Sequence, residues 1–85
     1  MNQAVQQITV LGSTGSIGVN TLDVIARHPA KFRAFALTAH TQVDAIVAQC
    51  VTHQPAFAVM GSEKHGRAVQ SALQVLGIKT AVLWG

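Results

Sequence analysis

The stretch Ile8-Thr9-Val10-Leu11-Gly12-Ser13-Thr14-Gly15-Ser16-Ile17-Gly18 determines the fold expected for this chain of 85 residues. Its first four residues form a short apolar run that is rich in β-branched side chains and ends at Gly12, which is typical of a buried strand. A helical pattern follows from Ser16 to about Arg27, and Pro29 prevents the helix from continuing. The stretch therefore predicts a strand, a glycine-rich turn and a helix.

The rest of the chain repeats this alternation of short strands and amphipathic helices. Thr41 and Asp44 match a capping-box pattern at the start of a second helix, and Gly77 is expected just after the end of a third. We expect strands at 8–11, 32–39, 57–60 and 80–83. The helices are expected to bury the stripes Val43, Ile46, Val47, Cys50, Val51 and Val69, Ala72, Leu73, Leu76. The order β-α-β-α-β-α-β predicts an α/β fold, namely a Rossmann-type doubly wound parallel sheet.

Composition limits both the size of the unit and its class. Residues 1–85 are enough for one contiguous unit, and only 11% of them are charged while 49% are hydrophobic. This balance suits a segment that further protein covers in part, so we expect the chain to be one part of a larger protein. The net charge is +3, but the lysines and arginines are scattered, which argues against nucleic-acid binding.

The compartment is expected to be the cytoplasm. The opening segment Met1–Gln7 has no basic region of the kind that begins a signal peptide. No apolar run approaches the length needed to cross a membrane, so we expect no membrane association. The single cysteine, Cys50, lies on the apolar side of an expected helix and is interpreted as a small buried hydrophobic residue.

The glycine-rich turn is the strongest indication of function. It lies between the first strand and the first helix, where a Rossmann-type sheet binds a dinucleotide pyrophosphate. We expect Gly12 to allow the tight turn, Gly15 to let the backbone approach the phosphates, and Gly18 to let helix and strand pack closely. Backbone N–H groups from Thr14 to Ile17 would face the anion, and the hydroxyls of Ser13, Thr14 and Ser16 could add hydrogen bonds. A plain strand-to-helix turn that uses glycine for its backbone angles is the alternative.

The end of the second strand indicates which dinucleotide is bound. NAD-specific proteins place an acidic residue there to bind the ribose hydroxyls, but this chain has none between Asp23 and Asp44. A cofactor 2′-phosphate would instead meet His40, Thr41 and Gln42, which favours NADPH. An exposed loop histidine and a helix-capping threonine are the competing interpretations of His40 and Thr41.

The chain offers no catalyst or metal site of its own. Its histidines are far apart in sequence, and no carboxylates are spaced as a pair or cluster. We therefore expect neither a catalytic residue nor a metal ligand among these residues, and we expect the fragment alone to be inactive.

The glycine-rich stretch followed by Thr21-Leu22-Asp23-Val24 closely resembles the opening of the 1-deoxy-D-xylulose 5-phosphate reductoisomerases. The likeness continues at Phe32-Arg33, Leu37, Val43, Gln49-Cys50, Pro55 and Ala58-Val59-Met60. The resemblance implies NADPH contacts at Thr14, Gly15, Ser16 and Ile17 and at His40, Thr41 and Gln42. Some members of the family have Gly-Lys-Asn at these last three positions, so the absence of a lysine here is expected to weaken recognition of the 2′-phosphate.

The resemblance also implies properties of a complete enzyme. It implies the conversion of 1-deoxy-D-xylulose 5-phosphate to 2-C-methyl-D-erythritol 4-phosphate in non-mevalonate isoprenoid biosynthesis, by a homodimer that uses NADPH and Mg or Mn. The catalytic and C-terminal domains would lie outside this chain, and the absence of a plastid transit peptide favours a bacterial source. Two alternatives remain, another NADP-dependent reductase with a Gly-x-Thr-Gly-x-x-Gly turn and a dinucleotide-binding module without catalysis.

Overall fold

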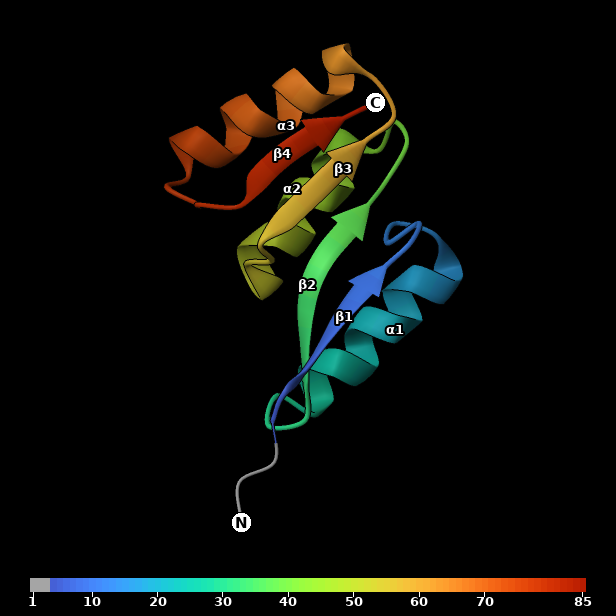
Figure 1. The fold of residues 1–85 in the computed structure, drawn as a ribbon. Helices are drawn as coiled ribbons and strands as arrows, with labels where there is room; N and C mark the ends of the chain where they lie inside the picture. Colours follow the sequence, from blue (N-terminus) through green and yellow to red (C-terminus); the bar gives the residue numbers. More distant parts are fainter. Residues whose placement is uncertain (1–3) are drawn as a thin grey trace.

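The computed structural model describes residues 4–85, so the first three residues of the predicted 1–85 unit lie outside the described part (Figure 1). Strands and helices alternate in the predicted order. The elements are β1 (Gln6–Val10), α1 (Ser16–Arg27), β2 (Phe32–Thr38), α2 (Val43–His53), β3 (Phe57–Met60), α3 (Glu63–Val75) and β4 (Ala81–Trp84). Within residues 4–85, no helix has the length and apolar character that crossing a bilayer requires.

The four strands form one parallel sheet in the order β1-β2-β3-β4, so each strand pairs with the strand before it in the chain. Right-handed crossovers that always step in one direction place their helices on one face of the sheet. The predicted α/β fold class is confirmed, and the described residues form an arrangement with helices on a single face, which corresponds to one half of a doubly wound sheet.

The core lies between this face of the sheet and the three helices. Side chains alternate along the strands, so that Ala58, Met60 and Val82 point into the core while their neighbours point away from it. Leu37 of β2, Ile46 of α2 and other helix residues complete the core. On the opposite face Phe35 and Leu83 are 39% and 49% exposed. The rings of Phe35 and Phe57 pack edge to face there, with their centroids 5.5 Å apart. This second face of the sheet is covered by no element within residues 4–85.

Local chemistry sets the two ends of α3. Ser62 is the N-cap, and its Oγ accepts a hydrogen bond from the backbone N–H of His65 at 3.4 Å. Gly77 follows the C-cap residue Leu76 and adopts a φ of +72°, as expected for a C′ glycine. Long-range pairing, by contrast, sets the ends of β1.

The predicted bounds of β1 and two of the predicted core positions are wrong. The strand begins at Gln6, whose N–H donates to the carbonyl of Lys31, and it ends at Val10. Leu11 therefore belongs to the turn and is 77% exposed. Val51 and Leu76, which were expected on buried helix faces, are 44% and 55% exposed because each lies at the margin of its stripe, near the end of its helix.

Candidate functional site

The glycine-rich turn is fixed to the end of β2 by its backbone. The side-chain Oγ1 of Thr38 accepts a hydrogen bond from Gly12 N at 2.8 Å, and the Thr38 carbonyl accepts one from Ser13 N at 2.8 Å. Gly15 N then donates to the Gly12 carbonyl at 3.0 Å and closes the turn. Gly12 has a φ of +61°, a conformation that suits glycine. The turn is thus held at the carboxyl edge of the sheet, where parallel α/β sheets bind ligands.

A second tether comes from α2. The fully buried Ser13 donates its hydroxyl to Gln49 Oε1 at 2.7 Å, and Gln49 Nε2 donates to the Ser13 carbonyl at 2.8 Å. The prediction that the Ser13 hydroxyl is available to a ligand is therefore wrong, because this hydroxyl holds the turn to the helix. Gln49 was not among the predicted site residues. The family resemblance at Gln49-Cys50 includes this residue but gives it no role.

The first turn of α1 is open to an anion. Gly15 is the N-cap, and among the described residues it makes no side-chain capping bond, while no acidic residue occupies the first turn. The first N–H groups of a helix have no partner within it and carry the positive end of the helix dipole. Here these are the groups of Ser16, Ile17 and Gly18. Ser16 is exposed, and Ile17 is 81% exposed beside it.

The turn glycines differ in the space around them. A Cβ at Gly18 would overlap the carbonyl oxygen of Gly12 and lie 2.6 Å from Ser13 Cα, so only glycine lets α1 pack against the turn. A Cβ at Gly15 would meet only the Gly12 oxygen, at an ordinary contact distance of 3.5 Å. Packing inside residues 4–85 therefore explains Gly18, whereas the surface beside Gly15 has room for a side chain or a ligand.

The loop after β2 lies at the same edge of the sheet as the turn, since Thr38 bonds the turn and His40 follows two residues later. His40, Thr41 and Gln42 are all exposed there. The predicted capping box of Thr41 and Asp44 is not formed, because α2 begins one residue later than that pattern requires, with Gln42 as the N-cap. The structure thus gathers the two predicted groups of site residues at one edge, and the Thr41 side chain is not used as a cap.

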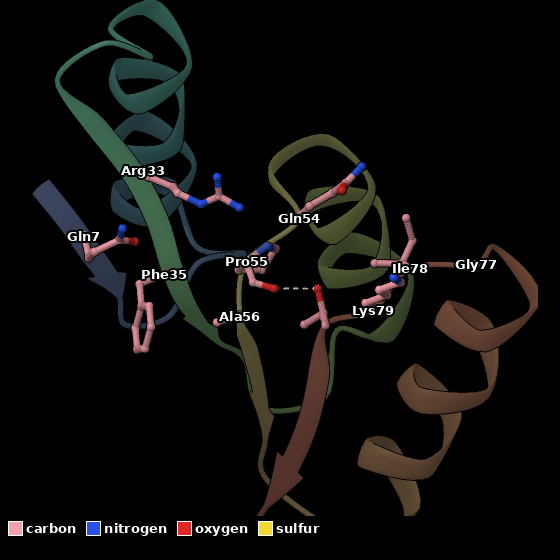
Figure 2. A pocket seen from close by; sticks show the side chains of 10 residues that line it. Gln7, Arg33, Phe35, Gln54, Pro55, Ala56, Gly77, Ile78 and Lys79 are labelled. Atoms are coloured by element: carbon pink, nitrogen blue, oxygen red, sulfur yellow. Dashed lines mark hydrogen bonds between the residues drawn. The ribbon is translucent and has the colours of Figure 1, made fainter. Parts of the chain in front are cut away.

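A cavity lies away from these residues (Figure 2). It has a volume of about 500 Å³ and is lined by Arg33 and Phe35 on the open face of the sheet. The segments before β3 and β4 complete its lining, and Thr80 Oγ1 donates a hydrogen bond between them to the Pro55 carbonyl at 2.7 Å. These segments lie at the amino edge of the sheet, opposite the turn. None of the predicted site residues lines this cavity.

Within residues 4–85, His, Cys, Asp and Glu form no group of three that could hold a metal ion. Burial raises the pKa of the Cys50 thiol from 9.0 to about 11, while the neighbouring Thr80 side chain opposes the shift. The cysteine is therefore a protonated core residue at neutral pH, as the sequence predicts.

Comparison with known proteins identifies relatives along nearly the whole chain. The family model for 1-deoxy-D-xylulose 5-phosphate reductoisomerase matches residues 8–85. The reductoisomerase of Pseudomonas putida strain KT2440 is 52% identical over 80 residues, which are 94% of this chain and 20% of that protein. The enzyme of Dechloromonas aromatica strain RCB is 49% identical over 85 residues, which are 100% of this chain and 21% of that protein. The chain thus spans about a fifth of the length of these relatives.

Solved structures of reductoisomerases also match this chain. A crystal structure of DOX-P reductoisomerase in complex with NADPH, fosmidomycin and magnesium has a TM-score of 0.89 and 31% identity, and the match covers 95% of this chain and 20% of that one. The reductoisomerase from Zymomonas mobilis in complex with NADPH has a TM-score of 0.87 and 30% identity, and the match covers 96% of this chain and 21% of that one.

Proposed function

The chain belongs to the 1-deoxy-D-xylulose 5-phosphate reductoisomerase family, and on this premise we propose that residues 1–85 are the N-terminal part of its NADPH-binding domain. The complete enzyme converts 1-deoxy-D-xylulose 5-phosphate to 2-C-methyl-D-erythritol 4-phosphate in isoprenoid biosynthesis. It acts in the bacterial cytoplasm as a homodimer, without nucleic acid or membrane partners. The family match and the relatives co-crystallised with NADPH support this proposal.

The observation that carries the proposal is the open N-terminus of α1 beside a glycine that the packing does not require. The N–H groups of Ser16, Ile17 and Gly18 would bind the pyrophosphate, with the Thr14 and Ser16 hydroxyls beside them. Gly15 leaves room for the phosphates, while Gly12 and Gly18 shape the turn. NADPH supplies the hydride when it is bound, and the residues of this chain bind and orient it.

The loop after β2 would bind the other end of the cofactor. His40, Thr41 and Gln42 are exposed at the edge that also holds the glycine-rich turn, and no acidic residue lies between Asp23 and Asp44 in the sequence. A carboxylate there would repel a 2′-phosphate, whereas these three side chains can donate hydrogen bonds to it. We propose that they select NADPH over NADH.

The divalent metal and the catalytic groups belong to the remainder of the complete enzyme. Because no group of three candidate ligands occurs within residues 4–85, this segment is proposed to bind the nucleotide only. The structure of a relative with magnesium supports a metal in the complete protein.

The selectivity of the β2 loop can be tested in the complete enzyme with Thr41→Glu. A charge-assisted hydrogen bond contributes about 1.5–3 kcal/mol, so we expect kcat/KM for NADPH to exceed that for NADH by about tenfold to a hundredfold, toward the lower value because no lysine is present. Thr41→Glu should reduce kcat/KM for NADPH more than for NADH. Ser71→Glu adds the same charge at an exposed position of α3 and should alter neither value. Equal kcat/KM for the two cofactors in the wild type would contradict the proposal.

A further inference from the structure

The backbones of β2 and β3 remain paired beyond the ends of the two strands. Ala39 N donates to the Val59 carbonyl at 3.0 Å, and Gly61 N donates to the His40 carbonyl at 3.2 Å. His40 and Gly61 are therefore direct neighbours at the carboxyl edge of the sheet. This is the edge to which Thr38 fixes the glycine-rich turn.

The imidazole of His40 occupies the space that a side chain at position 61 would need. A Cβ at Gly61 would overlap Nδ1 of His40 and lie 2.6 Å from its Cε1 and 3.1 Å from its Cγ. Backbone conformation gives no reason for glycine here, since the positive φ angles of the described glycines are confined to Gly12 and Gly77. A side chain at position 61 would therefore displace the exposed His40 ring from the place that it occupies.

The ring is placed for a ligand outside the sheet. His40 is exposed, and within residues 4–85 its ring nitrogens make no side-chain hydrogen bond. Because Gly61 has no side chain, the ring can lie across the ends of β2 and β3. From this place it can reach an anion at the same edge without first having to move.

We propose that Gly61 is a positioning residue for His40 and that it increases the affinity for the 2′-phosphate of NADPH by keeping the ring across the ends of β2 and β3. This inference rests on the proposed function, in which His40 faces that phosphate. A methyl group at position 61 displaces the ring, while the rest of the cofactor site is unchanged. NADH has no 2′-phosphate, so its affinity does not depend on residue 61.

The test is a double-mutant cycle in the complete enzyme, with Gly61→Ala, His40→Gly and the double variant. Dissociation constants for NADPH and NADH are measured by fluorescence titration. Loss of one hydrogen bond to the phosphate corresponds to about a threefold to tenfold change in affinity. We expect Gly61→Ala to raise the dissociation constant for NADPH by this factor and to leave that for NADH unchanged. In the His40→Gly background Gly61→Ala should have no further effect, because there is no ring to displace.

Ser71→Ala is the control, since Ser71 is an exposed residue of α3. This variant should retain wild-type affinity for both cofactors. If Gly61→Ala left NADPH affinity unchanged, or weakened it equally in the presence and absence of the His40 ring, the role of Gly61 would be overturned. A wild-type enzyme without any preference for NADPH would instead refute the proposed function of the β2 loop.

Discussion

Gly15 and Gly18 lie three residues apart, at the start of α1, and the structure gives them different roles. At Gly18 a methyl group would overlap the backbone of Gly12 and Ser13, which cannot move aside without opening the turn. At Gly15 the nearest described atom would lie 3.5 Å from a Cβ. Gly18 is thus a requirement of the fold, and Gly15 is a requirement of the proposed ligand.

Substitution should separate these two roles. We expect Gly15→Val to remain folded but to bind NADPH at least about a hundredfold more weakly, equivalent to about 2.7 kcal/mol, because its side chain fills the space of the pyrophosphate. Gly18→Ala should instead lower the free energy of unfolding by about 1–3 kcal/mol, the usual cost of overpacking. Calorimetric titration and thermal unfolding measure the two effects. A folded Gly15→Val protein with wild-type affinity would show that the glycine-rich turn does not bind the pyrophosphate.

Cys50 is expected to be unreactive in the folded protein. Its pKa of about 11 keeps the buried thiol protonated at pH 8, so alkylation by iodoacetamide should be slow until the protein is denatured. The pKa of Cys50 in the folded protein lies above the ordinary value of 9.0. The contribution of this thiol to the free energy of unfolding is therefore fully present below pH 9 and is lost as the pH rises toward 11. The expected slope is at most about 1.4 kcal/mol per pH unit. Cys50→Ala should lack this component, and rapid alkylation of native protein would contradict it.

At the scale of elements, α2 and the glycine-rich turn are joined by the reciprocal bonds of Ser13 and Gln49. We expect Gln49→Met to lower the free energy of unfolding by about 1–3 kcal/mol, because the Ser13 hydroxyl and carbonyl are left without partners. Gln74→Met makes the same change at an exposed position of α3 and should alter stability by less than about 0.5 kcal/mol. Denaturant titration compares the two variants. Equal losses would mean that the tether adds nothing to stability.

Several element ends that depend on neighbouring residues could be predicted from the sequence, although the capping box expected at Thr41 and Asp44 does not form. Ser62 and Gly77 bound α3 through contacts only a few residues away, and the predicted α1 coincides with the observed helix. Features that depend on distant residues could not be predicted in this way. Gln49 meets Ser13 36 positions away, and β1 extends back to Gln6 because Gln6 N pairs with the Lys31 carbonyl. The glycine-rich turn was predictable because its chemistry is local.

At the scale of the molecule, the open face of the sheet should promote association of the isolated chain of 85 residues. Phe35 and Leu83 are exposed on this face, and β4 has no further strand on its outer side within the described residues. Apolar patches and free strand edges favour contacts between copies. We expect sedimentation velocity to show self-association at high concentration.

A pair of lysine substitutions tests whether the sheet face is responsible. Leu83→Lys places a charge on the open face and should reduce the association. Val75→Lys alters a residue of α3 that is 87% exposed and should leave it unchanged. Strictly monomeric behaviour of the wild-type chain at millimolar concentration would exclude this role of the face.

The strand order β1-β2-β3-β4 has a consequence for the way the protein is made. A ribosome adds about 5–20 residues per second, so these residues emerge over roughly 4–17 s, amino end first. Each strand after β1 finds a partner already synthesised, because the preceding strand is its neighbour in the sheet. Among residues 4–85 no strand has to insert between two others that are already paired. The segment can therefore assemble one crossover at a time during translation, in the same order in which its codons are read.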